Sequence, residues 1–241
     1  MYKRQAGTTL DYSVTGDLDV DLMGSKNLTF NLEDSSATSD ELDITLSAND
    51  TDTDQTAEAE ITASVIAAGI ENVNIDSSAT TKSQESSPGA GDALTSADYT
   101  NNFDLFAEDA VNIVITGDAM LKLAVGDANS NARVEYIDAT GNSAGVLIDV
   151  SAVDASNAVT FNGSDADDNY SATQNGDAIQ ANAGADTINL ATTVVNTEVS
   201  TTAEERVRYV SADDSRLVLT DADADSMSGF DTVNNLSLIH I

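Results

Sequence analysis

The chain of 241 residues contains no cysteine, no tryptophan and a single proline. The lack of cysteine excludes disulfides, zinc thiolate sites and cysteine nucleophiles. Aromatic residues make up only 5% of the chain, which argues against a large ligand pocket with aromatic walls. No apolar run approaches the length of a membrane span, so we expect no insertion into a membrane. One proline is compatible with a fold of stacked strands.

Basic residues are also scarce, with 9 Lys and Arg against 42 Asp and Glu, and the formal net charge is −33. Such a surface repels nucleic acid and anionic lipid, and it either attracts divalent cations or tolerates high salt. The only histidine, His240, lies in the terminal segment. Because the common nucleophile–base pairs need cysteine or histidine, we expect no enzymatic activity.

Short segments in which apolar and polar residues alternate recur between turns rich in Ser, Thr, Asn, Asp and Gly. Alternation with a period of two predicts strands, and the clearest segments are 18–22, 28–32, 42–46, 111–115, 121–125 and 146–150. Residues 57–70 are the nearest candidate for a helix, but their β-branched residues favour a strand. The sequence therefore predicts an all-β fold of stacked short strands, similar to a β-solenoid.

Three nonapeptides follow one another at 163–171 (GSDADDNYS), 172–180 (ATQNGDAIQ) and 181–189 (ANAGADTIN). In each, the sixth residue is aspartate and the eighth is bulky: Asp168 and Tyr170, Asp177 and Ile179, Asp186 and Ile188. Each nonapeptide fits one turn and one short strand, and in a β-roll two of them make one coil of about eighteen residues. Asp168 and Asp186 then stack on one edge, and Asp177 lies on the other. The alternative interpretation is a set of ordinary Asp, Asn and Gly turns, as in any all-β protein. Such turns do not explain why both the aspartate and the bulky residue recur every nine residues.

This pattern resembles the calcium-binding RTX repeat, G-G-x-G-x-D-x-U-x. Of the glycine positions, only position one of the first nonapeptide and position four of the third are kept. The resemblance implies a short parallel β-roll at about residues 159–190 that binds Ca²⁺. The implied ligands are the side chains of Asp168, Asp177 and Asp186, with Gly163, Asp165, Asn182 and Gly184 at turn positions.

A wider resemblance extends to bacterial surface-layer proteins that carry RTX repeats. It rests on AVNIVITGDAMLKLAV (110–125), VEYIDATGNSAGVLIDVSA (134–152), VTFNGSDADDNYSA (159–172) and GIENVNIDS (69–77). The resemblance implies an extracellular structural protein at the cell surface, a calcium-dependent surface-layer or adhesin-like protein. Its expected partners are further copies of itself in a surface array, and cell-surface polysaccharide.

Two other functions remain open at this point. The chain could be the non-catalytic repeat region of a secreted RTX enzyme, such as a protease or lipase, whose catalytic domain lies outside it. It could also be an acidic surface protein of a halophile, without specific calcium sites, because acidity alone serves solubility in salt.

The composition along the chain suggests several segments. We expect a first β region at 6–76, a linker rich in Ser, Thr and Gly at 77–102, and a second β region at 103–158. The β-roll at 159–190 and an irregular β tail at 191–235 follow. Residues 1–5 (MYKRQ) and 236–241 (LSLIHI) match the two strands of a translated sequencing adapter. We therefore expect both ends to be artefacts that enclose an internal fragment of a longer reading frame.

Overall fold

The computed structural model describes residues 9–17, 26–31, 39–49, 62–80, 99–126, 133–153, 157–191, 206–208, 218–219, 227–228 and 231–234. Within these ranges every regular element is a strand, and no helix occurs. The odd sheet is parallel and contains β1 (Thr9–Asp17), β3 (Glu41–Asn49), β5 (Asn72–Thr80), β7 (Asn112–Gly117), β9 (Tyr136–Asn142), β11 (Thr160–Asn162), β13 (Ala178–Gln180) and β15 (Arg206–Val207). The even sheet is also parallel and contains β2 (Lys26–Asn31), β4 (Thr62–Ala68), β6 (Thr100–Phe106), β8 (Met120–Val125), β10 (Val146–Asp149), β12 (Asn169–Ser171), β14 (Thr187–Asn189) and β18 (Thr232–Asn234). A separate antiparallel pair consists of β16 (Val218–Leu219) and β17 (Met227–Ser228).

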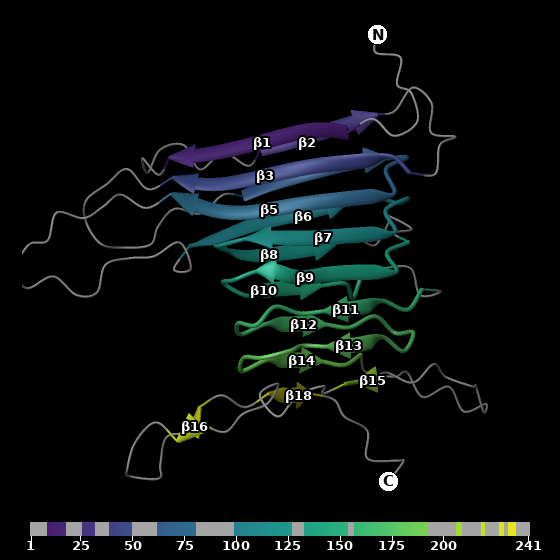
Figure 1. The fold of residues 1–241 in the computed structure, drawn as a ribbon. Coiled ribbons are helices and arrows are strands. Elements are labelled where there is room, and N and C mark those ends of the chain that lie inside the picture. Colours follow the sequence, from purple (N-terminus) through teal and green to yellow (C-terminus); the bar gives the residue numbers. More distant parts are fainter. Residues whose placement is uncertain are drawn as a thin grey trace, which may run out of the picture.

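The chain alternates between the two sheets, so two successive strands and their turns form one coil of a solenoid (Figure 1). Equivalent residues of successive coils pair directly. In the odd sheet Leu42 pairs with Val73, Val73 with Ile113, and Ile113 with Ile137. The coils therefore stack one on another from β1 and β2 at one end to β15 and β18 at the other.

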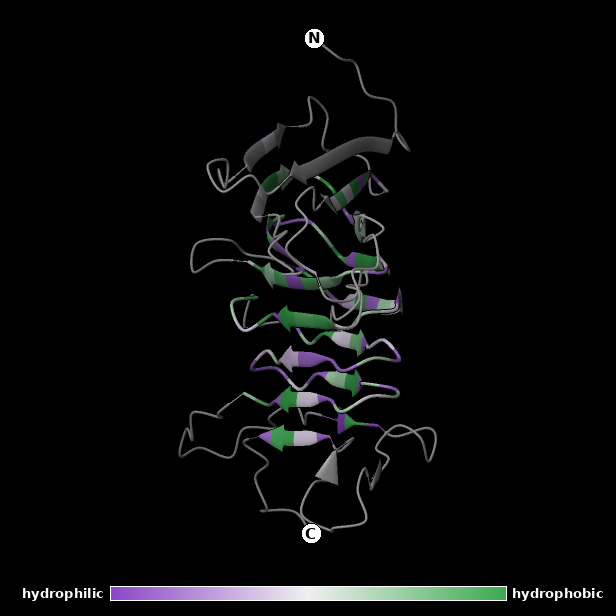
Figure 2. Cartoon of the chain, turned by 90° about the vertical axis from the view of Figure 1, so that its left-hand side faces the viewer, coloured by the Kyte–Doolittle hydropathy of each residue, from purple (hydrophilic) through white to green (hydrophobic). Residues whose placement is uncertain are grey.

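The core is a column of apolar side chains between the two sheets. Successive side chains of a strand point to opposite faces. In β3, Leu42, Ile44 and Leu46 are accordingly buried, while Asp43 and Thr45 are half-buried. Hydrophobic residues recur in strand after strand down the stack (Figure 2). Since burial of one large aliphatic side chain is worth about 1.5–3 kcal/mol, the alternating pattern determines which face of each strand turns inward.

The nonapeptides form the narrowest coils, with strands of three residues. Their middle residues, Tyr170, Ile179 and Ile188, are each 1% exposed. The aromatic ring of Tyr170 stacks on that of Phe161 from the odd sheet, with centroids 4.4 Å apart. Strand β13 lies in register with β11, and β14 with β12, at a separation of 18 residues. The coil length predicted from the nonapeptides is confirmed.

The all-β class is also confirmed, but the parallel roll is much longer than predicted. We expected it only over 159–190, whereas coils of the same topology begin at β1 and β2. Contacts between equivalent turns of the earlier coils span 31 residues from Asp40 to Glu71 and 40 residues from Gly69 to Asp109. Because these turns differ in length, no fixed period reveals the earlier coils in the sequence.

The predicted linker is shorter than residues 77–102. Residues 77–80 belong to β5 and 100–102 to β6, while 81–98 lie outside the described residues. Because β5 pairs with β7, the two predicted β regions belong to one continuous stack. The helix candidate at 57–70 contains the strand β4, as its β-branched residues indicate. The adapter-like segments 1–5 and 236–241 lie outside the described residues.

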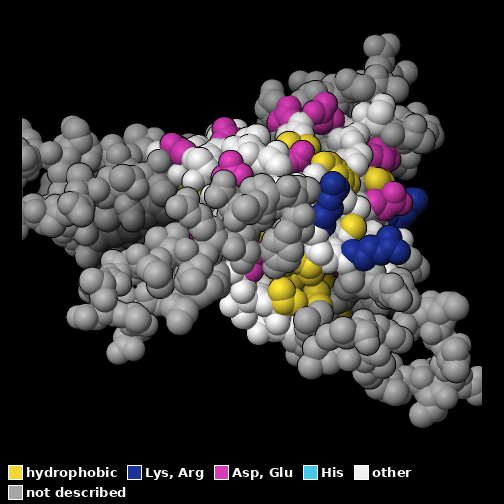
Figure 3. Space-filling view, turned by 60° about the horizontal axis from the view of Figure 1, so that its bottom comes forward, with side chains coloured by type: hydrophobic (Ala, Val, Ile, Leu, Met, Phe, Trp, Pro, Cys, Tyr) yellow, Lys and Arg dark blue, Asp and Glu magenta, His cyan; other side chains and the backbone are white. Residues whose placement is uncertain are grey.

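At the C-terminal end the stack is covered by two short strands, β15 and β18. Val207 and Val233 from these strands are partly buried against the core. Figure 3 looks toward this end and shows hydrophobic side chains at the surface next to Lys and Arg. The described part of the chain contains no helix long and apolar enough to cross a membrane.

Candidate functional site

The three nonapeptide aspartates lie directly before strands β12, β13 and β14, where the turns enter the sheets. Asp168, Asp177 and Asp186 are all buried, with exposed fractions of 4%, 0% and 1%. Asp168 and Asp186 precede neighbouring strands of the even sheet, whereas Asp177 precedes a strand of the odd sheet. The structure therefore brings Asp168 and Asp186 together on one edge and places Asp177 on the other.

Each of these carboxylates accepts a main-chain N–H from the equivalent position one coil earlier. Oδ1 of Asp168 accepts the N–H of Val146, Oδ1 of Asp177 that of Val159, and Oδ1 of Asp186 that of Asp168, each at 2.8 Å. A buried N–H needs an acceptor, and here the acceptor is the carboxylate of the following coil. We call these three bonds the carboxylate ladder; it joins successive coils at the start of their strands.

In the first two nonapeptides, a hydroxyl residue at position two completes the bonding of the aspartate. Ser164 donates its N–H to Oδ2 of Asp168 at 2.6 Å and its hydroxyl to Oδ1 at 2.8 Å. Thr173 donates its N–H to Oδ2 of Asp177 at 2.8 Å and its hydroxyl to Oδ1 at 2.6 Å. The hydroxyl of Tyr170 also donates to Oδ2 of Asp177, at 3.0 Å. Both oxygens of these two carboxylates therefore have protein donors.

The third nonapeptide lacks this arrangement. Its position two is Asn182, which has a φ of +71° and donates its side-chain N–H to the carbonyl oxygen of Gly163 at 2.7 Å. Oδ2 of Asp186 is consequently buried without a hydrogen-bond partner. An unsatisfied buried acceptor costs about 1–3 kcal/mol. Of the six oxygens of the three nonapeptide carboxylates, this is the one at which a further ligand would gain a bond.

Burial also makes the charged forms of Asp186 and Asp168 unfavourable. It raises the pKa of Asp186 to about 8, and the neighbouring charges of Asp168, Asp231 and Asp167 add to this effect. Burial likewise raises the pKa of Asp168 to about 6, against the opposing hydrogen bonds from Val146 and Ser164. Without a cation, burial therefore favours the protonated form of Asp186.

In buffer without divalent cations, we expect the melting temperature to fall as the pH rises from about 4 to 8. The folded chain holds the proton of Asp186 up to a pKa of about 8, whereas the ordinary value is 3.8. Between these values the folded state binds more protons than the unfolded state, so stability decreases as the pH rises. Thermal melts of the parent and of Asp186→Asn, which does not titrate, provide the measurement. The variant should give a flatter profile, and an equal slope in both would contradict the raised pKa.

The predicted turn residues occupy the tight parts of the site. A Cβ atom on Gly163 would lie 2.4 Å from the carbonyl oxygen of Ala181, in the next coil. Gly184 has a φ of +134°, and a Cβ atom there would lie 2.6 Å from the carbonyl oxygen of Ala166. Both positions therefore require glycine because adjacent turns nearly touch. Asp165 is exposed on its turn.

A fourth nonapeptide, at 226–234, escaped the sequence analysis. It places Asp231 and Val233 at positions six and eight. Val233 of β18 pairs with Ile188 of β14, and Oδ1 of Asp231 accepts the N–H of Asp186 at 3.1 Å across 45 residues. Asp231 therefore extends the carboxylate ladder by one coil. The signal was present in the sequence, because GADTIN (184–189) and GFDTVN (229–234) share the pattern G-x-D-T-[IV]-N.

The same bond occurs far from the nonapeptides, near the N-terminal end. Oε2 of Glu71 accepts the main-chain N–H of Asp40 at 2.8 Å, again from the equivalent position of the preceding coil. Glu71 follows Gly69 and precedes Val73, so that it occupies the position that aspartate holds in the nonapeptides. An acidic residue that bonds one coil backwards therefore also occurs outside the nonapeptides.

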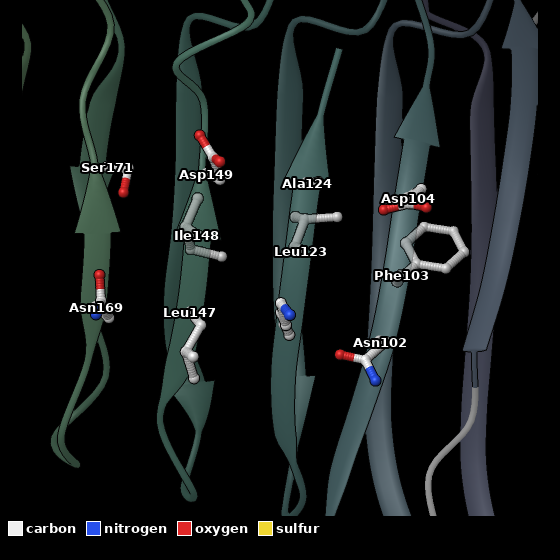
Figure 4. A pocket seen from close by; sticks show the side chains of 11 residues that line it. Asn102, Phe103, Asp104, Leu123, Ala124, Leu147, Ile148, Asp149, Asn169 and Ser171 are labelled. Atoms are coloured by element: carbon white, nitrogen blue, oxygen red, sulfur yellow. The ribbon is translucent and has the colours of Figure 1, made fainter. Parts of the chain in front are cut away.

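A shallow groove of about 390 Å³ lies apart from these turns, on the outer face of the even sheet (Figure 4). Asp104 and Asp149 lie in one row on either side of the small Ala124, because β8 runs between β6 and β10. Lys122 lines the groove in the neighbouring row. In the described ranges as a whole, no three His, Cys, Asp or Glu side chains form a group that could hold a metal ion.

Comparison with protein-family models, curated proteins and solved structures finds no significant match. The fold and the turn geometry are therefore the basis of the function proposed below. They define a parallel, two-sheet, roll-like all-β protein with buried acidic turns.

Proposed function

We propose that this chain is a structural segment of an extracellular protein, of the calcium-dependent surface-layer or RTX adhesin kind, whose roll is stabilised by Ca²⁺ in the third nonapeptide turn. The observation that carries the proposal is the buried Oδ2 of Asp186, which has no hydrogen-bond partner in a turn with the calcium-repeat pattern. Carboxylate and carbonyl oxygens, both present in this turn, are the ligands that Ca²⁺ prefers.

Asp186 would contribute Oδ2 to the cation. Ca²⁺ takes six to eight oxygen ligands, so main-chain carbonyls and water would supply the rest. The carbonyl oxygen of Ala166, from the preceding coil, lies close to Gly184 and is one candidate. Bound calcium would favour the ionised form of Asp186 and offset its repulsion with Asp168 and Asp231. It would in this way join two successive coils.

Structure and not catalysis is the proposed role. The stack of coils forms two parallel sheets with a continuous core, which suits a rigid building unit of a surface array. Extracellular calcium modules bind the ion at about 0.1–1 mM, so such a unit would be stable outside the cell. The net charge of −33 also favours binding of divalent cations. Self-assembly, and binding of cell-surface polysaccharide, belong to this proposal.

Two alternatives use the same fold. In the first, the roll is the non-catalytic repeat region of a secreted RTX enzyme, and flanking sequence with an H-E-x-x-H or G-x-S-x-G motif would favour it. In the second, the protein is an acidic halophile surface protein, and the charge serves solubility in salt. The unpartnered Asp186 oxygen favours calcium over this second alternative, since general acidity does not require it.

We expect millimolar calcium to raise the melting temperature above that in sodium chloride of equal ionic strength. A ligand at tenfold excess over its Kd stabilises the folded state by about 1.4 kcal/mol, or about 3–6 °C for a domain of this size. Screening alone acts equally in both salts. Differential scanning calorimetry of the parent, Asp186→Asn and Asp165→Asn makes the comparison.

The two variants replace a carboxyl group by an amide at a buried and at an exposed position. Only Asp186→Asn should lose the calcium response, and Asp165→Asn should keep it. Equal melts of the parent in calcium and sodium, with a further rise only in molar salt, would contradict the calcium proposal and favour the halophile alternative.

A further inference from the structure

The three nonapeptide turns differ at position two, and this difference decides whether the aspartate is saturated by protein donors. Ser164 and Thr173 donate both the N–H and the hydroxyl to the aspartate four residues later. Asn182, in the left-handed conformation, turns its side chain toward Gly163 instead. The aspartates themselves are alike, since all three are buried and all three bond one coil backwards.

We propose that the residue at position two selects which turns bind calcium. Ser164 and Thr173 direct their main-chain N–H to Oδ2 of the aspartate and so take the place of the cation, whereas Asn182, at positive φ, leaves Oδ2 of Asp186 open to it. This inference rests on the calcium site proposed above. The turns of one repeat array then differ in what neutralises the aspartate. Protein donors bind the carboxylates of Asp168 and Asp177, and a cation binds that of Asp186.

The donors of position two, the main-chain N–H and the hydroxyl together, can replace the cation because they meet the same need. A buried carboxylate needs either donors or positive charge. In the first two turns, the hydroxyl oxygen also accepts the N–H two residues later, from Ala166 to Ser164 at 3.1 Å and from Asn175 to Thr173 at 3.2 Å. The hydroxyl therefore bonds in both directions and fixes the turn around the carboxylate.

The backbone and side chain of Asn182 hold the third turn in a different conformation. Positive φ is costly for residues other than glycine, and asparagine is one of the few that tolerate it. The side chain of Asn182 bonds both the carbonyl oxygen of Gly163 and the side chain of Gln180, each at 2.7 Å. These bonds hold the third turn in its conformation and keep its position two away from Asp186, so that Oδ2 remains without a donor.

The test is isothermal titration of the full chain with Ca²⁺ at physiological ionic strength, together with thermal melts in chelator. Asn182→Ser disfavours positive φ and supplies the hydroxyl that fixes the other two turns, so that its main-chain N–H can reach Oδ2 of Asp186. It should weaken the tightest calcium site by at least about tenfold. The matched control Asn182→Gly permits positive φ without a hydroxyl, so it should bind calcium like the parent. In chelator, Asn182→Ser should melt at least as high as the parent.

The reverse change is made in the first turn. Ser164→Gly removes the hydroxyl that fixes the first turn and permits positive φ, which would turn the main-chain N–H away from Oδ2 of Asp168. It should add one bound calcium per chain, whereas Ser164→Thr keeps the hydroxyl and should add none. Ser164→Gly should also melt lower than the parent in chelator and regain the difference in calcium. This variant keeps the inference testable if Asn182→Ser does not fold, which circular dichroism would detect.

The outcomes separate this inference from the calcium proposal. If the parent binds no more calcium than Asp186→Asn, the proposed function and the inference both fail. If the parent binds calcium but Asn182→Ser binds it equally well, or Ser164→Gly gains no site, only the selection by position two is overturned. A loss of affinity in Asn182→Ser and a gain of one site in Ser164→Gly, with both controls unchanged, would support it.

Discussion

Replacement of Ile179 by aspartate is expected to abolish the cooperative melting of the C-terminal coils. Ile179 is 1% exposed in the middle of β13, where it pairs with Phe161 on one side and Val207 on the other. The change loses about 1.5–3 kcal/mol of apolar burial, and it adds the larger cost of a buried charge without a partner. Because a domain is typically stable by only about 5–15 kcal/mol, circular dichroism melts should show no native transition for these coils.

The neighbouring position provides a matched control for this prediction. Ala178 belongs to the same strand but is exposed, so Ala178→Asp should change the stability by no more than about 0.5 kcal/mol. Calcium should not rescue Ile179→Asp, because a cation in the turn cannot pair with a carboxylate inside the core. If Ile179→Asp melts like Ala178→Asp, the inward direction of Ile179 is wrong and the register of β13 with it.

The second large effect is expected for Asp177→Ala. The substitution removes the acceptor of four buried donors: the N–H of Val159, the N–H and hydroxyl of Thr173, and the hydroxyl of Tyr170. Hydrogen bonds to a charged group are worth about 1.5–3 kcal/mol each, and their effects overlap, so we expect a loss of at least about 3 kcal/mol. The melting temperature should fall by at least about 6–12 °C.

This loss should be the same in calcium and in chelator, because both oxygens of Asp177 already have protein donors. Thermal melts under both conditions make the measurement, with the exposed Asp165→Ala as the control for charge. Tyr170→Phe removes one of the four donors and should cost only about 1 kcal/mol. A loss that appears only in calcium would mean that Asp177 acts as a calcium ligand, contrary to this expectation.

The nonapeptide coils could be predicted from the sequence because two features repeat with the same period. Bulky residues such as Ile179 and Ile188 fill a narrow core, and the aspartate two residues earlier enters the turn. When every turn has the same length, the strands recur in the sequence with a fixed period. This period of nine residues, with two nonapeptides per coil as the resemblance to a β-roll implies, predicted the 18-residue coil and the placement of Asp168 and Asp186 on one edge.

The rest of the roll could not be predicted in this way, because insertions change the length of the turns while the strands stay in register. Asp231 repeats the role of Asp186 after 45 residues. Glu71, whose side chain is one methylene longer, accepts the same bond as the aspartates of the nonapeptides. The sequence pattern also could not predict that Oδ2 of Asp186 has no hydrogen-bond partner. This feature depends on the backbone conformation of Asn182, which the residue type permits but does not impose.

The carboxylate ladder gives the solenoid a direction. Where the ladder forms, a coil receives its acceptor from the coil that follows it in the chain, as when Asp231 bonds the N–H of Asp186 and Asp186 bonds that of Asp168. A chain that emerges N-terminus first therefore leaves its newest coil with an uncapped amide until the next turn arrives. The growing end is always the less complete one, and loss of a C-terminal coil exposes a donor in the coil before it. Loss of an N-terminal coil leaves only a carboxylate, which water solvates readily.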